Sequence, residues 1–169
     1  QKGYEIVSPS MRDWDKTMAE IHELITILYQ DFPIYKSITK KDFCTYFASY
    51  KSIVDLRMVK MAYYRGRAVG FYISIPNYNN AVYHTSNPLN ILRILRLRKN
   101  PTEYVMLYMG VLPEHQGLGK VLVQSIMNEL KESGLGSIGA LQRDGKITQS
   151  YVNELIEKRY EYVLLKRGL

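Results

Sequence analysis

The sequence has few of the residues that build disulfides, metal clusters or membrane spans. Cys44 is its single cysteine, so neither an intrachain disulfide nor a cysteine-based metal cluster can form. The three histidines lack metal-ligand spacing, so no metal is expected, and no Ser-His-Asp grouping is present. The most apolar run, Tyr104 to Leu112, is far shorter than the roughly 20 residues of a membrane helix. We therefore expect no stable membrane insertion and a cytoplasmic location.

The length and composition predict one globular domain over residues 1–169. The chain starts at Gln1 rather than Met, which is compatible with excision from a longer protein. Its net charge of +7 favours an anionic partner, such as nucleic acid, an anionic membrane or a phosphorylated small molecule. Because no helix-turn-helix spacing or aromatic RNA-binding signature is present, we expect no nucleic-acid partner.

Hydrophobic periodicity predicts alternating helices and strands along the chain. Apolar residues at helical spacing predict helices at 11–30, 39–52, 89–99, 118–133 and about 148–158. Alternating or continuous apolar runs predict strands at 3–7, 56–64, 68–75, 104–111, 137–141 and 160–166. Ser10 and Thr39 are expected N-caps, and Gly134 is an expected helix end. This order predicts an α/β fold, a mixed central sheet with helices on both faces.

The strand expected at 104–111 leads into a helix through a short glycine-containing turn. The turn has the sequence Val111-Leu-Pro-Glu-His-Gln-Gly-Leu-Gly-Lys120. The first N–H groups of a helix are unpaired and carry partial positive charge, which suits phosphate oxygens. Gly117 and Gly119 would let the backbone approach a pyrophosphate closely, although Gly-x-Gly also occurs in ordinary tight connections. The turn is neither a Walker loop nor a complete dinucleotide-binding fingerprint.

This turn resembles the acyl-CoA motif of the GNAT N-acetyltransferase superfamily, Val-x-Pro-x-x-Arg/Gln-Gly-x-Gly-x-Gly/Ala. In one alignment Gln116 takes the Arg/Gln place, and Val121 stands where the family prefers Gly or Ala. In the other, the two glycines are shifted by two places and Glu114 takes the Arg/Gln place. The element order is similar to the GNAT fold over nearly the whole chain. The Ile75–Asn79 stretch and the basic segment after it also resemble an uncharacterised bacterial branch of the superfamily.

The resemblance implies acetyl-CoA as cosubstrate, bound where two central parallel strands splay apart. Backbone groups of Met109 and Val111 are implied to bind the pantetheine and the acyl carbonyl, and Gln116 to Val121 to cradle the pyrophosphate. The acceptor implied is a primary amine of a small molecule or peptide, which attacks the thioester directly. The residues implied to bind the cofactor are Met109, Gly110, Val111, Gln116, Gly117, Leu118, Gly119, Lys120 and Val121.

The general acid is where the sequence departs from the family pattern. The family often has a tyrosine in the last helix, but Ile156 occupies that position and Tyr160 stands at a family glycine. Tyr151, on the same expected helix, and Tyr108, on the motif strand, are candidate replacements. The alternative for each is packing in the core or at the surface, which is the more common role of a tyrosine on a strand or helix.

The candidate general base is Glu103, because family members can use a glutamate at the start of the motif strand. Its alternative role is a solvated charge at a strand end. His115, in the glycine turn, is expected to face solvent. His84 and His22 have no partner pattern and are expected at the surface or as satisfied core residues.

The segment at 89–99 interleaves four cations with leucine and isoleucine. It predicts a surface helix whose cations extend from an inward apolar face. Contact with an anionic membrane, or with an acidic partner such as an acyl-carrier protein, remains an alternative. A homodimer is compatible with the sequence.

Two functions follow from these features. The first is an acyl-CoA-dependent N-acetyltransferase. The second is a non-catalytic acyl-CoA-binding regulatory module with the same fold, an alternative that the missing helix tyrosine and the non-Met start leave open.

Overall fold

The computed structural model describes residues 3–31, 36–83, 86–139 and 156–160, and within them one five-stranded sheet. The strand order is β1-β2-β3-β4-β5. The strands are β1 (Tyr4–Val7), β2 (Val59–Tyr64), β3 (Arg67–Pro76), β4 (Glu103–Val111) and β5 (Gly136–Gly139). The first four are antiparallel neighbours, and β5 pairs with β4 in parallel. The predicted mixed sheet, with the apolar motif strand β4 inside it, is confirmed.

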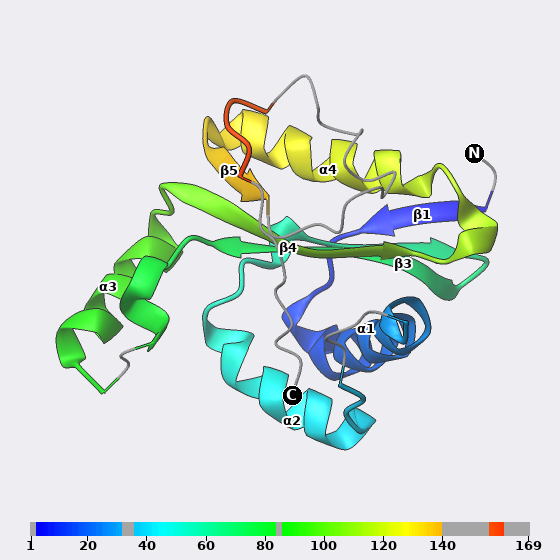
Figure 1. Cartoon of the computed structure of the whole chain (residues 1–169), viewed down its shortest axis with the longest axis horizontal. Coiled ribbons are helices and arrows are strands. Elements are labelled where there is room, and N and C mark those ends of the chain that lie inside the picture. The colour runs from blue at the N-terminus through cyan, green and yellow to red at the C-terminus, as the bar shows by residue number, and fades with distance from the viewer. Residues whose placement is uncertain (1–2, 32–35, 84–85, 140–155, 161–169) are drawn as a thin grey trace, which may run out of the picture.

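The helices lie on both faces of this sheet, as predicted. They are α1 (Trp14–Tyr29), α2 (Lys40–Ala48), α3 (Pro88–Lys99) and α4 (Leu118–Ser133). Figure 1 shows α4 over one face and α1 with α2 over the other, while α3 lies beside the sheet. Short 3-10 turns also occur: η1 (Met11–Asp13), η2 (Ser49–Ser52), η3 (Leu56–Met58), η4 (Asn79–Tyr83) and η5 (Pro113–His115).

The core has two layers, one on each side of the sheet. Ile21 of α1 is fully buried on one side, and Leu122 and Ile126 of α4 are fully buried on the other. Leu122 and Ile126 are four residues apart, so they share one face of α4. Phe71 and Met61 from the central strands are also fully buried. Apolar burial of this kind is the main favourable contribution to folding, and here it fixes α1 and α4 against the strands between them.

Two predicted element ends differ from the structure, and two are confirmed. Ser10 precedes η1 rather than α1, and its hydroxyl donates to Asp13 at 2.5 Å instead of capping the helix. Leu56–Met58 is a 3-10 turn rather than strand, because the Asp55 carboxylate accepts a bond from the Arg57 N–H at 3.1 Å. Thr39 caps α2 as predicted, and Gly134 ends α4 in a left-handed conformation.

The chain after β5 was expected to form a helix and a last strand. Most of both segments, 148–155 and 161–166, lies outside the described residues. Ile156–Lys158, the expected end of the helix, is not helical, and Tyr160 is not in a strand. All five residues from 156 to 160 are exposed, so no buried face holds them in regular structure. Within the described part of the chain, no helix is long and apolar enough to cross a membrane.

Truncating the buried face of α1 should destabilise the fold far more than truncating its exposed face. Ile21→Ala removes a side chain with 0% exposure and should lower the free energy of unfolding by about 2 to 5 kcal/mol. Ile27→Ala, on the same helix at 47% exposure, is the matched control and should change it by about 0.5 kcal/mol or less. Urea unfolding of the two variants measures the difference, and equal losses would contradict the assigned faces of α1.

Stability should fall in alkali through buried tyrosines. Burial raises the pKa of Tyr72 to about 12, whereas the unfolded chain loses this proton near pH 10. The stabilisation of the folded state by protonated Tyr72 is therefore fully present below about pH 10 and is lost as the pH rises through about 12. Tyr72→Phe should lose less stability than the parent chain as the pH rises above 10. Urea unfolding measured across this pH range tests the prediction. The same dependence of the unfolding free energy on pH in both proteins would refute it.

Candidate functional site

A β-bulge in β4 sets which side chains share the face of the sheet under α1. Ile73 pairs with Tyr108 and Ser74 with Met106, so Leu107 is an extra residue without a partner on β3. Glu103 and Tyr108 are five positions apart, which would place them on opposite faces of a regular strand. With the extra residue between them, both lie on the face that α1 covers. The bulge therefore places the two described candidates for proton transfer on the same face of the sheet, at opposite ends of β4.

Among the described residues, the second half of β4, from Leu107 to Val111, has no partner on its β5 side, and we call this stretch the open edge. The parallel ladder ends with the pair Met106 and Gly139, so no described residue of β5 pairs with β4 beyond that point. On the other side, the Leu112 N–H donates to the Val69 carbonyl at 2.9 Å. Because hydrogen-bonded pairs alternate along an antiparallel ladder, Met109 and Val111 direct their N–H and C=O groups away from β3. These are the two backbone positions predicted to bind pantetheine.

Tyr29, the last residue of α1, reaches this open edge and was missed from the sequence. Its hydroxyl donates to the Met109 carbonyl at 3.0 Å, and its ring meets that of Tyr108 edge to face with centroids 6.4 Å apart. Burial, followed by the neighbouring Tyr108, raises the pKa of Tyr29, although the bond to Met109 opposes the shift. Tyr29 therefore keeps its proton at neutral pH. No sequence pattern links it to a residue 80 positions later.

Gly110 lets α1 approach β4 closely enough for that contact. A Cβ at this position would lie 2.5 Å from Cδ1 of Leu28 and 3.0 Å from Cε1 of Phe71. Both distances are below ordinary van der Waals contact, so a larger residue would push the end of α1 away from the strand. The glycine thus has a packing role that its predicted place in the cofactor site did not indicate.

The N-terminus of α4 is arranged as an anion site. Gly117 precedes the helix with φ +92°, a left-handed conformation that favours glycine, and no side chain caps the helix. The N–H groups of Leu118 and Gly119 have no hydrogen-bond partner among the described residues. Lys120 is exposed in a first turn that contains no acidic residue. Free amides, a helix dipole and a cation together fit a phosphate group.

The remaining residues of the predicted cradle face solvent. Gln116 and Glu114 are both exposed, and Val121 is 45% exposed at the first turn of α4. Whichever alignment of the glycine motif is used, the residue at its Arg/Gln position is therefore exposed on the loop.

The expectation that His115 faces solvent is wrong. His115 is half-buried, and its Nδ1 is 2.8 Å from the Tyr4 hydroxyl. Its ring also contacts the ring of Tyr64, with centroids 5.2 Å apart. These contacts tie the turn before α4 to β1 and β2, so His115 positions the loop. Of the other histidines, His22 makes a 2.8 Å contact through Nε2 with the Ile38 carbonyl, and His84 lies outside the described residues.

Glu103 lies at the opposite end of β4 from the glycine turn. Its Oε2 accepts a hydrogen bond from Asn77 Nδ2 at 2.6 Å, so the side chain is held in place rather than freely solvated. The open edge starts at Leu107, four residues along the strand, which is roughly 13 Å. At that separation neither a direct hydrogen bond nor one bridging water joins Glu103 to an amine at the open edge, so a proton would have to pass along a chain of waters.

The predicted acid Tyr151 lies outside the described residues. Ile156, at the place of the family tyrosine, is 40% exposed, and Tyr160 is 74% exposed. Tyr108, 45% exposed on β4, is the predicted acid that the structure describes.

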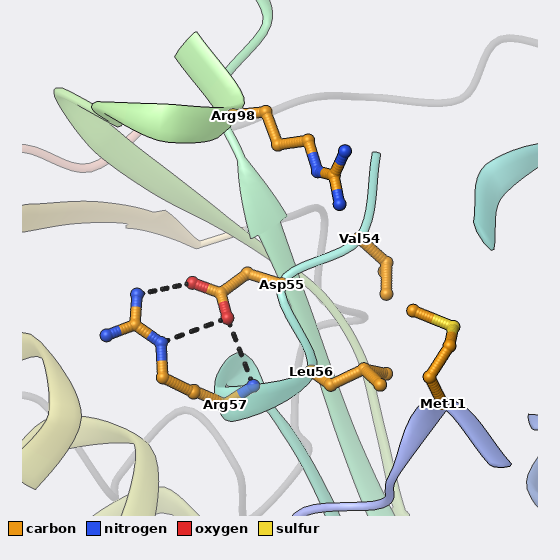
Figure 2. A pocket seen from close by; sticks show the side chains of 6 residues that line it. All are labelled: Met11, Val54, Asp55, Leu56, Arg57 and Arg98. Carbon is orange, nitrogen blue, oxygen red and sulfur yellow. Dashed lines mark hydrogen bonds and ion pairs between the residues drawn. The ribbon is translucent and has the colours of Figure 1, made fainter. Parts of the chain in front are cut away.

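A separate hollow of about 280 Å³ opens near the start of β4. Figure 2 shows Asp55 pointing toward Arg57, with Arg98 extending from α3. Asp55 Oδ2 accepts bonds from Arg57 Nη2 at 2.8 Å and from the Tyr104 hydroxyl at 2.7 Å. Burial opposes ionisation, but these bonds outweigh it and lower the pKa of Asp55. Because its pKa is lowered, the Asp55 carboxylate is a poor proton acceptor. Elsewhere too, the described residues contain no group of three potential metal ligands.

Replacing Gly117 should strain the turn without crowding it. No described atom lies within 4 Å of a Cβ built there, so Gly117→Ala acts through its left-handed φ alone. We expect a loss of about 1 to 2 kcal/mol in the free energy of unfolding. Gly136→Ala in β5 is the control, since its Cβ also meets no described atom and its backbone is not left-handed. Equal stability of the two variants in urea would contradict the assigned turn geometry.

Comparison with solved structures identifies the fold. No protein-family model and no curated protein matches the sequence, so the likeness rests on structure. A ribosomal-protein-alanine N-acetyltransferase from Brucella melitensis biovar Abortus 2308 has 15% identity and a TM-score of 0.57, with 98% of this chain and 99% of that one covered. An aminoglycoside acetyltransferase from an uncultured soil metagenomic sample has 14% identity and a TM-score of 0.60, with 100% and 98% covered.

A third similar structure contains a cofactor analogue. It is AAC(6')-Iy in complex with the bisubstrate analogue CoA-S-monomethyl-acetylneamine, at 15% identity and a TM-score of 0.57, with 98% of both chains covered. At these identities the likeness concerns the fold. Over almost its whole length, the chain has the fold of the GNAT N-acetyltransferases.

Proposed function

We propose that the protein is an acyl-CoA-dependent N-acetyltransferase that transfers an acetyl group from acetyl-CoA to a primary amine by direct attack. One observation carries the proposal: the open edge of β4 leads directly into the uncapped, glycine-preceded N-terminus of α4. The strand offers an extended pantetheine arm backbone groups that no described strand pairs, and the helix offers amides to phosphates. The solved acetyltransferases with the same fold support the proposal, one of them with a CoA-containing analogue.

The cofactor would lie along these two features in sequence. Backbone groups of Met109 and Val111 would bind the pantetheine, and the amides of Leu118 and Gly119 would bind the pyrophosphate. Lys120 adds a positive charge beside them. Acetyl-CoA supplies an acetyl group activated as a thioester, and the chain itself supplies binding, orientation and proton transfer.

Proton transfer is assigned to the face of β4 that α1 covers. Glu103, held by Asn77, would accept the ammonium proton of the acceptor through a chain of several waters. Tyr108, half exposed at the open edge, would donate a proton to the departing thiolate. Tyr29 would act as a positioning residue, since it contacts both the Tyr108 ring and the Met109 carbonyl. Tyr151 remains the alternative acid.

The acceptor proposed is a primary amine of a small molecule or a peptide. Two proteins with the same fold are an aminoglycoside acetyltransferase and a ribosomal-protein-alanine N-acetyltransferase, which represent these two kinds of acceptor. The described residues favour neither class.

A second function, a non-catalytic acyl-CoA-binding regulatory module, is favoured by one observation. Ile156 replaces the tyrosine that the family often uses as acid, and the residue is exposed rather than placed in a helix. Such a module would keep the cofactor site and lack turnover.

Cofactor binding and turnover are measured separately. Acetyl-CoA at millimolar concentration should raise the Tm, and Lys120→Gln should reduce the shift more than the exposed control Lys131→Gln, because only Lys120 lies at the helix N-terminus. No shift in the parent chain would refute both functions. Release of free CoA thiol with a panel of amines and N-terminal peptides then separates them, since a binding module stays silent with every acceptor.

The assigned roles predict which variants slow turnover. With an accepted amine, Glu103→Gln should lower kcat by about 100-fold or more. Tyr108→Phe should also lower kcat, whereas Tyr46→Phe, at 57% exposure on α2, should not. Full activity of Tyr108→Phe would transfer the acid role to another residue, of which Tyr151 is the first to test.

A further inference from the structure

Helix α3 carries large apolar side chains that face solvent. Within the described residues, the helix packs against the protein mainly through Ile94, which joins a small cluster with Tyr78 and Ala81. Four aliphatic residues of its first two turns are exposed by 46% to 72%: Leu89, Ile91, Leu92 and Leu95. Tyr83 of η4, the turn that precedes the helix, is 79% exposed. A cluster of this kind is unusual at a free surface and indicates an interaction site.

The outer side of α3 combines these apolar residues with cations. At 3.6 residues per turn, Leu89, Leu92, Arg96 and Lys99 form one stripe on the side opposite Ile94. The first half of this α3 stripe is apolar and the second half is basic, and Arg93 lies beside it. Neither Arg96 nor Lys99 forms an ion pair with a described residue. The stripe therefore offers uncompensated charge next to exposed aliphatic surface.

The surrounding sequence also lacks compensating charge. No aspartate or glutamate occurs between Asp55 and Glu103, a stretch that contains eight lysines and arginines. A second copy of the chain docked on the α3 stripe would therefore bring cations against cations or against leucines, with no carboxylate from this region to pair them. A surface complementary to the α3 stripe would carry anionic groups on its outside and apolar groups directly beneath them.

The geometry points to the α3 stripe as a docking site for an anionic phospholipid surface. Leu89 and Leu92 enter the boundary between headgroups and acyl chains, and Arg96 and Lys99 contact lipid phosphates. Tyr83 suits the same depth, because tyrosine combines an apolar ring with a polar tip. Figure 1 shows α3 beside the sheet, away from the faces covered by α1, α2 and α4, so none of these three helices covers its outer side. The docking is peripheral and independent of acetyl-CoA.

The test is flotation of the full chain with vesicles of phosphatidylcholine, with and without phosphatidylglycerol. We expect binding to the mixed vesicles and none to phosphatidylcholine alone. Arg96→Gln/Lys99→Gln should weaken binding about tenfold or more. Leu89→Gln/Leu92→Gln, which leaves the charge unchanged, should weaken it as well. The charge-matched control Lys41→Gln/Lys131→Gln removes exposed cations from α2 and α4 and should bind like the parent chain.

Each alternative outcome has a distinct signature. Absence of binding by the parent chain overturns the proposal, and so does equal weakening by the control, which would show attraction by net charge alone. Light scattering that shows a dimer abolished by Leu89→Gln/Leu92→Gln assigns the stripe to a second copy instead. All substituted side chains are exposed, so an unchanged Tm verifies folding. Vesicle binding without acetyltransferase activity would leave this proposal intact and refute only the enzymatic one.

Discussion

The structure depends on how β4 satisfies its backbone hydrogen bonds. Over its first half, β4 lies between β3 and β5 and is paired with both. Beyond Met106 the described part of β5 ends, while β4 continues to Val111. Peptide groups in the interior need partners, and unpaired ones cost free energy comparable to a lost hydrogen bond. The open edge is therefore a place where an extended ligand can add hydrogen bonds that the described residues do not make.

Several local features position residues around this edge. The bulge at Leu107 rotates the strand so that Glu103 and Tyr108 share a face. Gly110 gives α1 room to pack closely, which brings the Tyr29 hydroxyl to the Met109 carbonyl. That bond satisfies one acceptor at the edge, and a carbonyl oxygen retains a second lone pair for a ligand. At the end of the strand, His115 ties the turn to β1 and β2, so the amides of α4 are held in a fixed position. The proposed cofactor binding and proton transfer thus involve one strand and its neighbours.

Sequence patterns predicted most of the described elements because those elements have strong periodicity. β4 is a continuous apolar run, and α1 and α4 have apolar residues at helical spacing. The glycine turn was recognisable because phosphate binding requires small residues between a strand and a helix. The bulge was not predictable, since a single extra residue leaves the apolar run unchanged. The contact of Tyr29 with β4 depends on tertiary packing, and the Tyr4–His115 bond joins residues 111 positions apart. Long-range contacts of this kind leave no local signal.

Hydrogen exchange measured with and without CoA tests the central claim most directly, because it reports on the backbone amides themselves. If β4 and α4 form the cofactor site, CoA should slow exchange at Met109, Val111, Leu118 and Gly119, while amides of β1 and β2 keep their rates. Unchanged exchange at these four amides under saturating CoA, or protection confined to another part of the chain, would contradict the account.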